Sequence, residues 1–388
     1  MKKIISILGS TGSVGLNALS IIEKKKNLFK FNLLSANKNY SLICKQIVKY
    51  NPSIFVINDK KIFTKIKNKF KKKKIRIFNN YDDLKLKKIS HITISAIPGI
   101  AGLKPTITMI EKSKKFLIAN KESIICGWNL IEKLSKKNNT KIIPIDSEHF
   151  SIFKLLENHK IKDIKKIYIT ASGGPFLNYL PYQLKKIKPT QALKHPKWKM
   201  GKKISIDSST LMNKILELIE AQKLFNLKIE TLDILIHPDS LVHAIVEFKN
   251  GLTKFIYHDT SMIIPLANAI FDGSLNIEKF YKTRKKIIND LSFKKVNPNL
   301  FPIIKIKNRL DEYPSTPIII NAVNEILVDQ FLQKNIRFSD INKIIMAVLK
   351  DRNYRKYAIR KPINIKVIQL INDWAKELTL KKYVKTNQ

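Results

Sequence analysis

Short apolar runs alternate with amphipathic stretches over residues 1–145. The runs are rich in Ile, Leu, Val and Phe, which favour strands, whereas the stretches between them repeat apolar residues at helical spacing. This alternation predicts a parallel sheet covered by helices, which is an α/β fold. The expected strands are 3–8, 31–36, 54–57, 75–78, 92–96, 116–119 and 141–145.

The pattern changes after about residue 147. A strand at 166–170 runs into a Gly-Gly turn, and the polar, proline-containing segment that follows, to about Lys203, has no clear periodicity. A stretch of this length in a compact protein is usually a functional lid or a disordered piece.

The remaining chain predicts a second sheet and then helices. Asn250-Gly251 predicts a hairpin within an antiparallel sheet, and a loop-rich connector follows at about 272–300. The expected strands are 232–236, 242–248 and 252–257, and the expected helices are 316–334, 339–350 and 363–380.

Charge is the unusual feature of the composition. The 388 residues carry a formal charge of +43, from 73 Lys and Arg against 30 Asp and Glu, a balance that ordinarily suggests a nucleic-acid or anionic-membrane partner. The basic residues are spread and are nearly all Lys, and the chain is also rich in Ile and Asn, as AT-rich genomes encode. Arg, which reads bases, is scarce. We therefore expect solvated lysine faces, with neither a nucleic-acid nor a membrane partner.

The number of cysteines and the first residues of the chain indicate the cellular compartment of the protein. Only Cys44 and Cys126 occur, without metal-ligand spacing, which favours a reduced compartment. The apolar run after Met1 is cut by Gly9 and Gly12, far below the length of a secretory signal core. No run of about 18 apolar residues exists. We expect a cytoplasmic protein.

The clearest ligand motif is Gly9-Ser-Thr-Gly-Ser-Val-Gly15, which directly follows the first strand and precedes a helical pattern. Glycine allows a tight strand-to-helix turn and lets backbone approach a pyrophosphate at the helix N-terminus. The spacing is G-x-x-G-x-x-G, not the usual G-x-G-x-x-G. The interpretation as a nucleotide site therefore depends on the position of the motif in a βαβ unit.

The second strand ends in Asn37-Lys38-Asn39, where an NAD site usually has Asp or Glu for the ribose hydroxyl. A lysine can instead pair with the extra phosphate of NADP, which favours NADPH. The alternative is that Lys38 is one more surface lysine of a lysine-rich chain.

Acidic residues follow the strand that ends near Ile145, where ligands gather in parallel sheets. Asp146 and Glu148 lie there, and Asn213 and Glu217 share a face of a helix that Asp207 and Ser208 are expected to initiate. Three carboxylates without Cys or paired His suit a hard divalent ion. The alternative is that Glu217 is a solvated helix residue and Asp146 a cap.

Hydroxyls, small turns and a lysine suit a phosphate monoester. Ser172-Gly-Gly-Pro175 follows a strand, and Ser208 precedes Lys214. In the aperiodic segment, His195-Pro-Lys-Trp-Lys-Met-Gly201 is unusual as a plain linker, and we interpret it as a flap that closes over substrate and excludes water. The alternative is that Trp198 packs into its own domain's surface.

Together these residues resemble the 1-deoxy-D-xylulose 5-phosphate reductoisomerase family of NADPH-dependent enzymes, which make 2-C-methyl-D-erythritol 4-phosphate in the non-mevalonate isoprenoid route. The blocks that carry the resemblance occur in family order over almost the whole chain. They are ILGSTGSVG, ANKES, PIDSEH, ASGGPF, HPKWKMGKKISIDSSTLMNK, LELIEA, ILIHPDS and NAVNEI.

The resemblance implies a role for each matching residue. The implied metal ligands, for Mg²⁺ or Mn²⁺ with Co²⁺ as a further option, are Asp146, Glu148 and Glu217. The implied catalytic residues are Lys121, Glu122 and His195. The implied substrate contacts are Ser147, Glu148, Ser172, His195, Trp198, Met200, Ser208, Asn213, Lys214 and Glu217. The implied NADPH contacts are Thr11, Gly12, Ser13, Val14, Asn37, Lys38, Asn39, Asn120, Glu122 and Gly201.

The resemblance also implies a homodimer and an organisation in three domains. A Rossmann-like NADPH domain is expected at 1–146, an α+β catalytic domain at 147–272 with the flap at about 173–203, a connector at 273–300 and a helical bundle at 301–388. In the implied reaction a divalent ion polarises the substrate's carbonyl and hydroxyl during rearrangement, and NADPH delivers hydride to the aldehyde.

The chain departs from the family pattern in two places. Asn37 stands where the family commonly has glycine, and Ser261-Met-Ile263 replaces a usual Asp-Met-Arg, within an atypical segment that reaches Asn276. We expect the second departure to affect the edge of the central sheet or the dimer contacts.

Two other functions are consistent with parts of the sequence. A catalytically degenerate, NADP-binding or nucleic-acid-binding remnant would keep the fold, but the intact acidic set and Lys214 argue against it. A plain NADP-dependent dehydrogenase explains the glycine turn but gives no role to the phosphate and metal residues.

Overall fold

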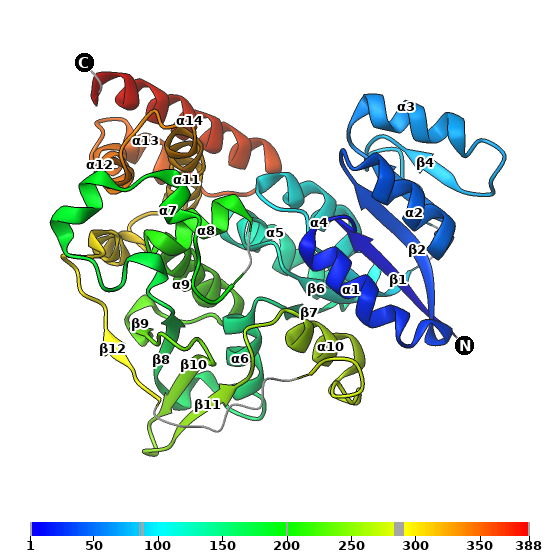
Figure 1. The fold of residues 1–388 in the computed structure, drawn as a ribbon, viewed down its shortest axis with the longest axis horizontal. Coiled ribbons are helices and arrows are strands. Elements are labelled where there is room, and N and C mark those ends of the chain that lie inside the picture. Colours follow the sequence, from blue (N-terminus) through cyan, green and yellow to red (C-terminus); the bar gives the residue numbers. More distant parts are fainter. Residues whose placement is uncertain (1, 85, 87–88, 199–200, 283–290, 387–388) are drawn as a thin grey trace. The chain divides into compact units, whose positions relative to one another are not determined.

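Figure 1 shows the computed structural model of the chain, which describes residues 2–84, 86, 89–198, 201–282 and 291–386. The chain forms two compact units. The first consists of Met1–Ser123, Asn129–Phe150 and Ser261–Thr283, and the second of Ile124–Trp128, Ser151–Thr260 and Arg284–Gln388. The predicted domain boundaries stay a prediction, because compactness does not show which segments fold independently.

The first unit is built on a seven-stranded sheet in the order β4-β3-β2-β1-β5-β6-β7, and every neighbouring pair is parallel. The strand order reverses between β1 and β5, which is where such sheets bind ligands. All seven predicted strands are confirmed, with ends within three residues of those expected. They are β1 (Lys3–Leu8), β2 (Phe29–Ala36), β3 (Ile54–Ile57), β4 (Arg76–Phe78), β5 (Ser90–Ser95), β6 (Ser113–Ile118) and β7 (Lys141–Pro144).

Helices connect these strands. On α3, Ile66 and Phe70 are buried while Lys65, Lys67 and Lys69 are exposed, so this dense basic run covers a solvated face. The helices of this unit, some of which also carry residues of the second, are α1 (Ser13–Glu23), η1 (Lys26–Leu28), α2 (Tyr40–Tyr50), α3 (Lys60–Lys69), η2 (Ile100–Gly102), α4 (Leu103–Ile110), α5 (Lys121–Asn138), α6 (Ser147–Leu155) and α10 (Ile263–Phe271).

The helix α10 was not predicted, and it begins within the departure at 261–263. It packs against α1 within the first unit. Phe271 at its end makes an edge contact with Phe29, with ring centroids 5.6 Å apart, and the next residue, Asp272, pairs with Lys115 at 2.6 Å. Helix α10 thus belongs to the first unit, and the expected effect of the departure on the edge of the central sheet or on the dimer contacts stays a prediction.

The second unit contains a five-stranded sheet in the order β11-β10-β8-β9-β12. The β8–β9 pair is parallel and the other pairs are antiparallel. The predicted hairpin is confirmed between β10 and β11, where Gly251 has φ +87° and its N–H donates to the carbonyl of Phe248 at 3.1 Å. The strands are β8 (Ile164–Ala171), β9 (Leu232–Ile236), β10 (Val242–Phe248), β11 (Thr253–Tyr257) and β12 (Lys294–Lys295).

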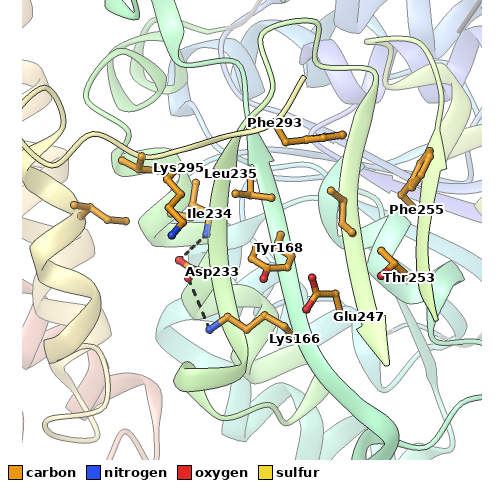
Figure 2. Close-up of a pocket in the computed structure, with 13 residues that line it drawn as sticks. Lys166, Tyr168, Asp233, Ile234, Leu235, Glu247, Thr253, Phe255, Phe293 and Lys295 are labelled. Atoms are coloured by element: carbon orange, nitrogen blue, oxygen red, sulfur yellow. Dashed lines mark hydrogen bonds and ion pairs between the residues drawn. The ribbon is translucent and has the colours of Figure 1, made fainter. Parts of the chain in front are cut away.

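The two faces of this sheet differ. Ile167 and Ile169 of β8 are fully buried on the face that α9 (Met212–Phe225) covers. Their neighbours Lys166 and Tyr168 point to the other face, which carries an open cavity of about 730 Å³ (Figure 2). The alternation follows from the period of two along a strand.

The C-terminal segment forms the helical bundle that the sequence predicts, with α11, α12 and α14 packed on one another. None of the helices in the described parts of the chain is both long and apolar enough to cross a membrane. The remaining helices are η3 (Ile161–Asp163), η4 (Gly174–Phe176), η5 (Pro181–Lys186), α7 (Pro189–Ala192), α8 (Lys202–Ser209), η6 (Ile229–Thr231), η7 (Pro302–Arg309), α11 (Thr316–Leu332), α12 (Phe338–Leu349), α13 (Tyr354–Ala358) and α14 (Ile365–Thr386).

One predicted helix start was wrong. Asp207 and Ser208 do not initiate the helix that carries Asn213, because they lie in the last turn of α8. Leu211 then adopts a left-handed conformation, with φ +65°, and α9 begins at Met212. A non-glycine residue in this region is uncommon, and nothing in the local pattern indicates it.

Candidate cofactor and active site

The glycine turn lies between β1 and α1, at the position where the strand order reverses. Gly9 has φ +82°, and a Cβ there would lie 2.7 Å from the carbonyl oxygen of Ala96. A Cβ on Gly15 would lie 2.3 Å from the carbonyl oxygen of Gly9. Gly12 begins α1 without a side-chain cap, so the first helical turn offers its N–H groups to an anion. The turn therefore fits a pyrophosphate.

The three residues Asn37, Lys38 and Asn39 follow β2, the strand beside β1, and all are exposed. Asn39 caps α2, because its Oδ1 accepts from the N–H of Leu42 at 3.0 Å. Parallel neighbouring strands end at the same edge of the sheet, so the lysine and the glycine turn lie at one edge. This placement fits the predicted pairing of Lys38 with a ribose phosphate.

Asn120 links two loops at the carboxyl ends of β5 and β6. Its Oδ1 caps α5 by accepting from Ser123 N at 2.8 Å, and its Nδ2 donates to the carbonyl of Gly99 and to Glu122 Oε2, both at 3.0 Å. Asn120 and Glu122 are 3% and 8% exposed. The amide therefore holds the carboxylate of Glu122 in a fixed position.

The carboxylate of Asp146 lies beside an ammonium group. Lys121 begins α5 after β6, Asp146 follows β7, and the two parallel neighbours bring Lys121 Nζ within 3.1 Å of Asp146 Oδ2. The other oxygen, Oδ1, accepts from the N–H of Ser147 at 3.1 Å, and Ser147 Oγ donates to Glu148 Oε2 at 2.6 Å. The first unit thus gathers two of the predicted metal ligands with Lys121 and Ser147.

In the second unit, a glycine turn links two residues of the predicted phosphate site, the side chain of Ser172 and the backbone of Ser208. Ser172 Oγ accepts from the N–H of Gly174 at 3.1 Å. A Cβ on Gly174 would lie 3.0 Å from the carbonyl oxygen of Ser208, so the turn packs directly on the end of α8. Gly173 and Gly174 both have positive φ, of +82° and +64°, which favours glycine at both positions.

The protonation of His195 follows from its contacts. Its Nδ1 accepts from the N–H groups of Trp198, at 2.9 Å, and of Lys197, at 3.2 Å, so the proton of the neutral ring lies on Nε2. Nε2 in turn donates to Ser172 Oγ at 3.1 Å. Burial, and after it the nearby ammonium of Lys214, lowers the pKa of His195 to about 4. Near pH 7 the ring is a neutral N–H donor.

Helix α9 brings three predicted residues together on one face. The Nζ of Lys214 lies 2.7 Å from Glu217 Oε2, and Asn213 Nδ2 donates to Glu217 Oε1. Glu217 is 1% exposed and Lys214 7%. A buried carboxylate is costly unless it is paired, and here the ammonium and the amide stabilise it. The alternative of a solvated Glu217 is therefore wrong.

The flap residues are only partly described. Trp198 is half-buried, and its ring makes an edge contact with that of His243, with centroids 6.2 Å apart. Gly201 is exposed and begins α8. Met200 lies outside the described residues.

Sequence reasoning missed a buried polar contact next to the predicted phosphate residues. Asp207 Oδ1 accepts from Asn324 Nδ2 of α11 at 2.7 Å, and its Oδ2 pairs with Lys203 Nζ at 2.8 Å. Asp207 and Asn324 are 1% and 0% exposed. The available signal was the amide of Asn324 in the apolar first half of α11, where Asn321 is the other amide.

Models of one family match most of the chain. The reductoisomerase model, 1-deoxy-D-xylulose 5-phosphate reductoisomerase, matches residues 5–127. Two models of the C-terminal domains of the same family match residues 142–225 and 259–378.

Relatives and solved structures agree with these matches. The chain is 46% identical to the 1-deoxy-D-xylulose 5-phosphate reductoisomerase of Pelagibacter ubique, over 96% of this chain and 97% of the relative, and 41% identical to that of Clostridium novyi, over 88% and 91%. A crystal structure of DOX-P reductoisomerase with NADPH, fosmidomycin and magnesium superposes with a TM-score of 0.90 at 28% identity, covering 100% of this chain and 99% of that one. The Zymomonas mobilis reductoisomerase with NADPH gives 0.89 at 29% identity, covering 99% of each chain.

Proposed function

The chain belongs to the 1-deoxy-D-xylulose 5-phosphate reductoisomerase family, and on this premise we propose which of its residues perform each part of the reaction. The chain is an NADPH-dependent oxidoreductase that converts 1-deoxy-D-xylulose 5-phosphate to 2-C-methyl-D-erythritol 4-phosphate, and it uses magnesium. The comparisons do not favour the alternative of a non-catalytic remnant. The observation that best supports the residue assignment is the contact of buried Glu217 with buried Lys214 and half-buried Asn213, because the ammonium suits a phosphate and the carboxylate suits a metal ion.

NADPH binds along the carboxyl edge of the parallel sheet in this proposal. The pyrophosphate lies on the N–H groups of Ser13 and Val14 at the start of α1, and Thr11 and Gly12 contribute to the same turn. Lys38 and its neighbours Asn37 and Asn39 bind the ribose phosphate. Asn120, Glu122 and Gly201 complete the contacts.

The metal is held by Asp146, Glu148 and Glu217. Three carboxylates are a hard oxygen set that fits Mg²⁺ and also suits Mn²⁺ or Co²⁺. When bound, the ion supplies Lewis acidity to the oxygens of the substrate's reacting end. Lys121, at 3.1 Å from Asp146, orients that carboxylate and adds positive charge beside the reacting oxygens.

The phosphate of the substrate is bound by Ser172, Ser208, Asn213 and Lys214. A phosphate dianion would compete with Glu217 for the ammonium of Lys214, and Glu217 is the residue of this helix that would hold the metal. His195 donates its Nε2 proton in a hydrogen bond, and because its pKa is about 4 it does so as a neutral ring that carries no extra charge. Binding of the remote phosphate then orients the reacting end.

The flap at about 173–203 closes over the substrate and excludes water. Trp198 covers the substrate in this proposal, with Met200 beside it in the sequence. Ser147 contacts the reacting end in this proposal. It stands between the metal ligands Asp146 and Glu148 in the sequence, and its hydroxyl donates to Glu148.

We propose that two copies of the chain form a homodimer through the open face of the five-stranded sheet (Figure 2). A two-fold contact sets the same patch against itself, so it needs apolar area and both signs of charge. This face has Phe255, which is 46% exposed, and the pair Lys166–Asp233 at 3.7 Å.

The dimer is tested by sedimentation velocity of the wild type and of Phe255→Glu. A wild-type dimer that Phe255→Glu converts to folded monomer supports the proposal. A wild-type monomer, or a dimer that the substitution leaves intact, contradicts it. A cytoplasmic location is proposed in addition, because a chain with only two cysteines, Cys44 and Cys126, is typical of a reduced compartment.

The activity is tested by NADPH oxidation with the sugar phosphate. Lys214→Ala should raise the KM for the sugar phosphate by about a hundredfold, as the loss of a charge-assisted contact requires. The KM for NADPH should not change. If Lys214→Ala alters the KM for NADPH and leaves that for the sugar phosphate unchanged, the phosphate assignment is wrong.

A further inference from the structure

A buried polar cluster joins the glycine turn to β2 and α2, outside the residues assigned to NADPH. Its members are Ser10 of the turn, Ser35 of β2 and Gln46 of α2, which are 0%, 2% and 4% exposed. Ser10 and Gln46 are 36 positions apart in the chain. Buried hydrogen-bonded groups of this kind are costly to leave without partners, so the cluster restrains the three segments that it joins.

Gln46 bonds Ser10 twice. Its Nε2 donates to the backbone carbonyl of Ser10 at 2.9 Å, and its Oε1 lies 2.6 Å from Ser10 Oγ. The carbonyl can only accept, so the amide group must face it with its nitrogen and not its oxygen. Oε1 therefore accepts the hydroxyl proton of Ser10, for which the carbonyl of Ser35 is a second and longer acceptor at 3.0 Å, and the pairing with Gln46 is reciprocal.

The same turn is fixed to β2 by its backbone. The N–H of Ser10 donates to the carbonyl of Ser35 at 2.8 Å, and the N–H of Gly9 donates to Ser35 Oγ at 3.0 Å. These bonds hold one side of the turn against the strand. Gln46 holds the other side from a helix, so no shift of the turn is possible without breaking a buried bond.

Helix α2 is also the element that positions Lys38. It begins at Tyr40, directly after Lys38 and the cap Asn39. A bond from Gln46 to Ser10 consequently fixes the spacing between the turn and the lysine. Any cofactor that contacts both at once depends on this spacing, whereas a cofactor that contacts only the turn depends on it less.

We propose that Gln46 is a positioning residue for NADPH, which sets the distance between the glycine turn and Lys38 and so supports the preference for NADPH over NADH. The inference rests on the proposed contact of Lys38 with the ribose phosphate. Gln46 itself touches no cofactor atom in this account. It acts only through Ser10 and α2.

The test is the dissociation constant of NADPH and of NADH, measured by fluorescence for the full chain and its variants. Gln46→Met keeps the length of the side chain and removes both bonds. It should weaken NADPH binding about tenfold, the size expected of two neutral hydrogen bonds, and weaken NADH binding less. If Gln46→Met weakens the binding of NADPH and of NADH by the same factor, or weakens neither, the proposal is overturned.

Two further variants separate positioning from stability. Ile47→Ala removes a buried apolar side chain of the same helix, 1% exposed, which has no polar group to bond the turn. It should lower the melting temperature and leave the ratio of the two dissociation constants unchanged. If Ile47→Ala lowers the ratio of the NADH to the NADPH dissociation constant as much as Gln46→Met does, the role of Gln46 is merely structural.

Ser10→Ala removes the partner hydroxyl with a small change in volume, and it serves if Gln46→Met fails to fold. Alone it should weaken NADPH binding by about threefold, the size of one neutral hydrogen bond. In the double variant with Gln46→Met, Ser10→Ala should raise the NADPH dissociation constant by less than it does alone, because both changes remove the same bond. Full additivity contradicts the proposal. A separate Lys38→Ala variant that keeps the preference for NADPH would contradict the lysine assignment and not the bond between Gln46 and Ser10.

Discussion

Gly174 is the position where a single methyl group should most selectively disturb phosphate binding. Its φ of +64° is a left-handed conformation, which costs an alanine about 1–2 kcal/mol. A Cβ there would also lie 3.0 Å from the carbonyl oxygen of Ser208, whereas ordinary contact begins at 3.4 Å. Gly174→Ala must therefore push the end of α8 away by about 0.4 Å, the difference of these two distances.

Gly251 offers a matched control in the same unit. It also has positive φ, of +87°, but a Cβ there would meet nothing within 4 Å. Gly251→Ala thus carries the conformational cost alone. Gly251→Ala should lose about 1–2 kcal/mol of unfolding free energy, measured by urea denaturation, and Gly174→Ala should lose more because of its close contact with Ser208.

Only Gly174→Ala should change the kinetics. Displacement of Ser208 stretches its hydrogen bond to the phosphate, and we expect the KM for the sugar phosphate to rise about tenfold while the KM for NADPH stays constant. The assay is NADPH oxidation at varied sugar phosphate. If both glycine variants have the same KM for the sugar phosphate, Ser172 and Ser208 do not form one phosphate site.

Three further predictions concern the cofactor, a protonation state and the metal. Lys38→Ala should weaken NADPH binding about tenfold, the lower end for a charge-assisted bond because Lys38 is exposed, and should leave NADH binding unchanged in a titration. The pKa of His195 in the folded chain, about 4, lies below its ordinary value of 6.5. The contribution of His195 to stability is therefore present above pH 6.5 and is lost as the pH falls toward 4. The melting temperature of His195→Gln should fall less than that of the wild type between these two pH values. Glu217→Gln should lower turnover on the order of a hundredfold and leave the NADPH dissociation constant unchanged, and a collapse of NADPH affinity would contradict the separate metal assignment.

The sequence predicts most of the first sheet because buried strands are runs of Ile, Leu, Val and Phe bounded by turns. The helix α10 escaped because Ile263–Phe271 is short, almost uniformly apolar and contains a proline, so that no polar face marks it as a helix. The break between α8 and α9 escaped because Leu211, not a glycine or asparagine, adopts the left-handed conformation. Local sequence preferences do not indicate conformations of this kind, which are set by packing in the folded chain.

The candidate site was predicted to different depths. Spacing alone places Asn213, Lys214 and Glu217 on one helical face, and that face is confirmed. The neutral state of His195 could not be predicted, because it depends on burial and on the N–H groups of Trp198 and Lys197. Contacts between distant segments, such as those of Asp207 with Asn324, need the folded chain.

The central claim is that this chain rearranges and reduces a sugar phosphate with the help of a divalent ion. The most direct test is NADPH oxidation with 1-deoxy-D-xylulose 5-phosphate, after chelation of metal and after addition of Mg²⁺. The account predicts turnover that needs both the sugar phosphate and the ion, with 2-C-methyl-D-erythritol 4-phosphate as product. No turnover with Mg²⁺ present, or equal turnover without any divalent ion, would contradict it.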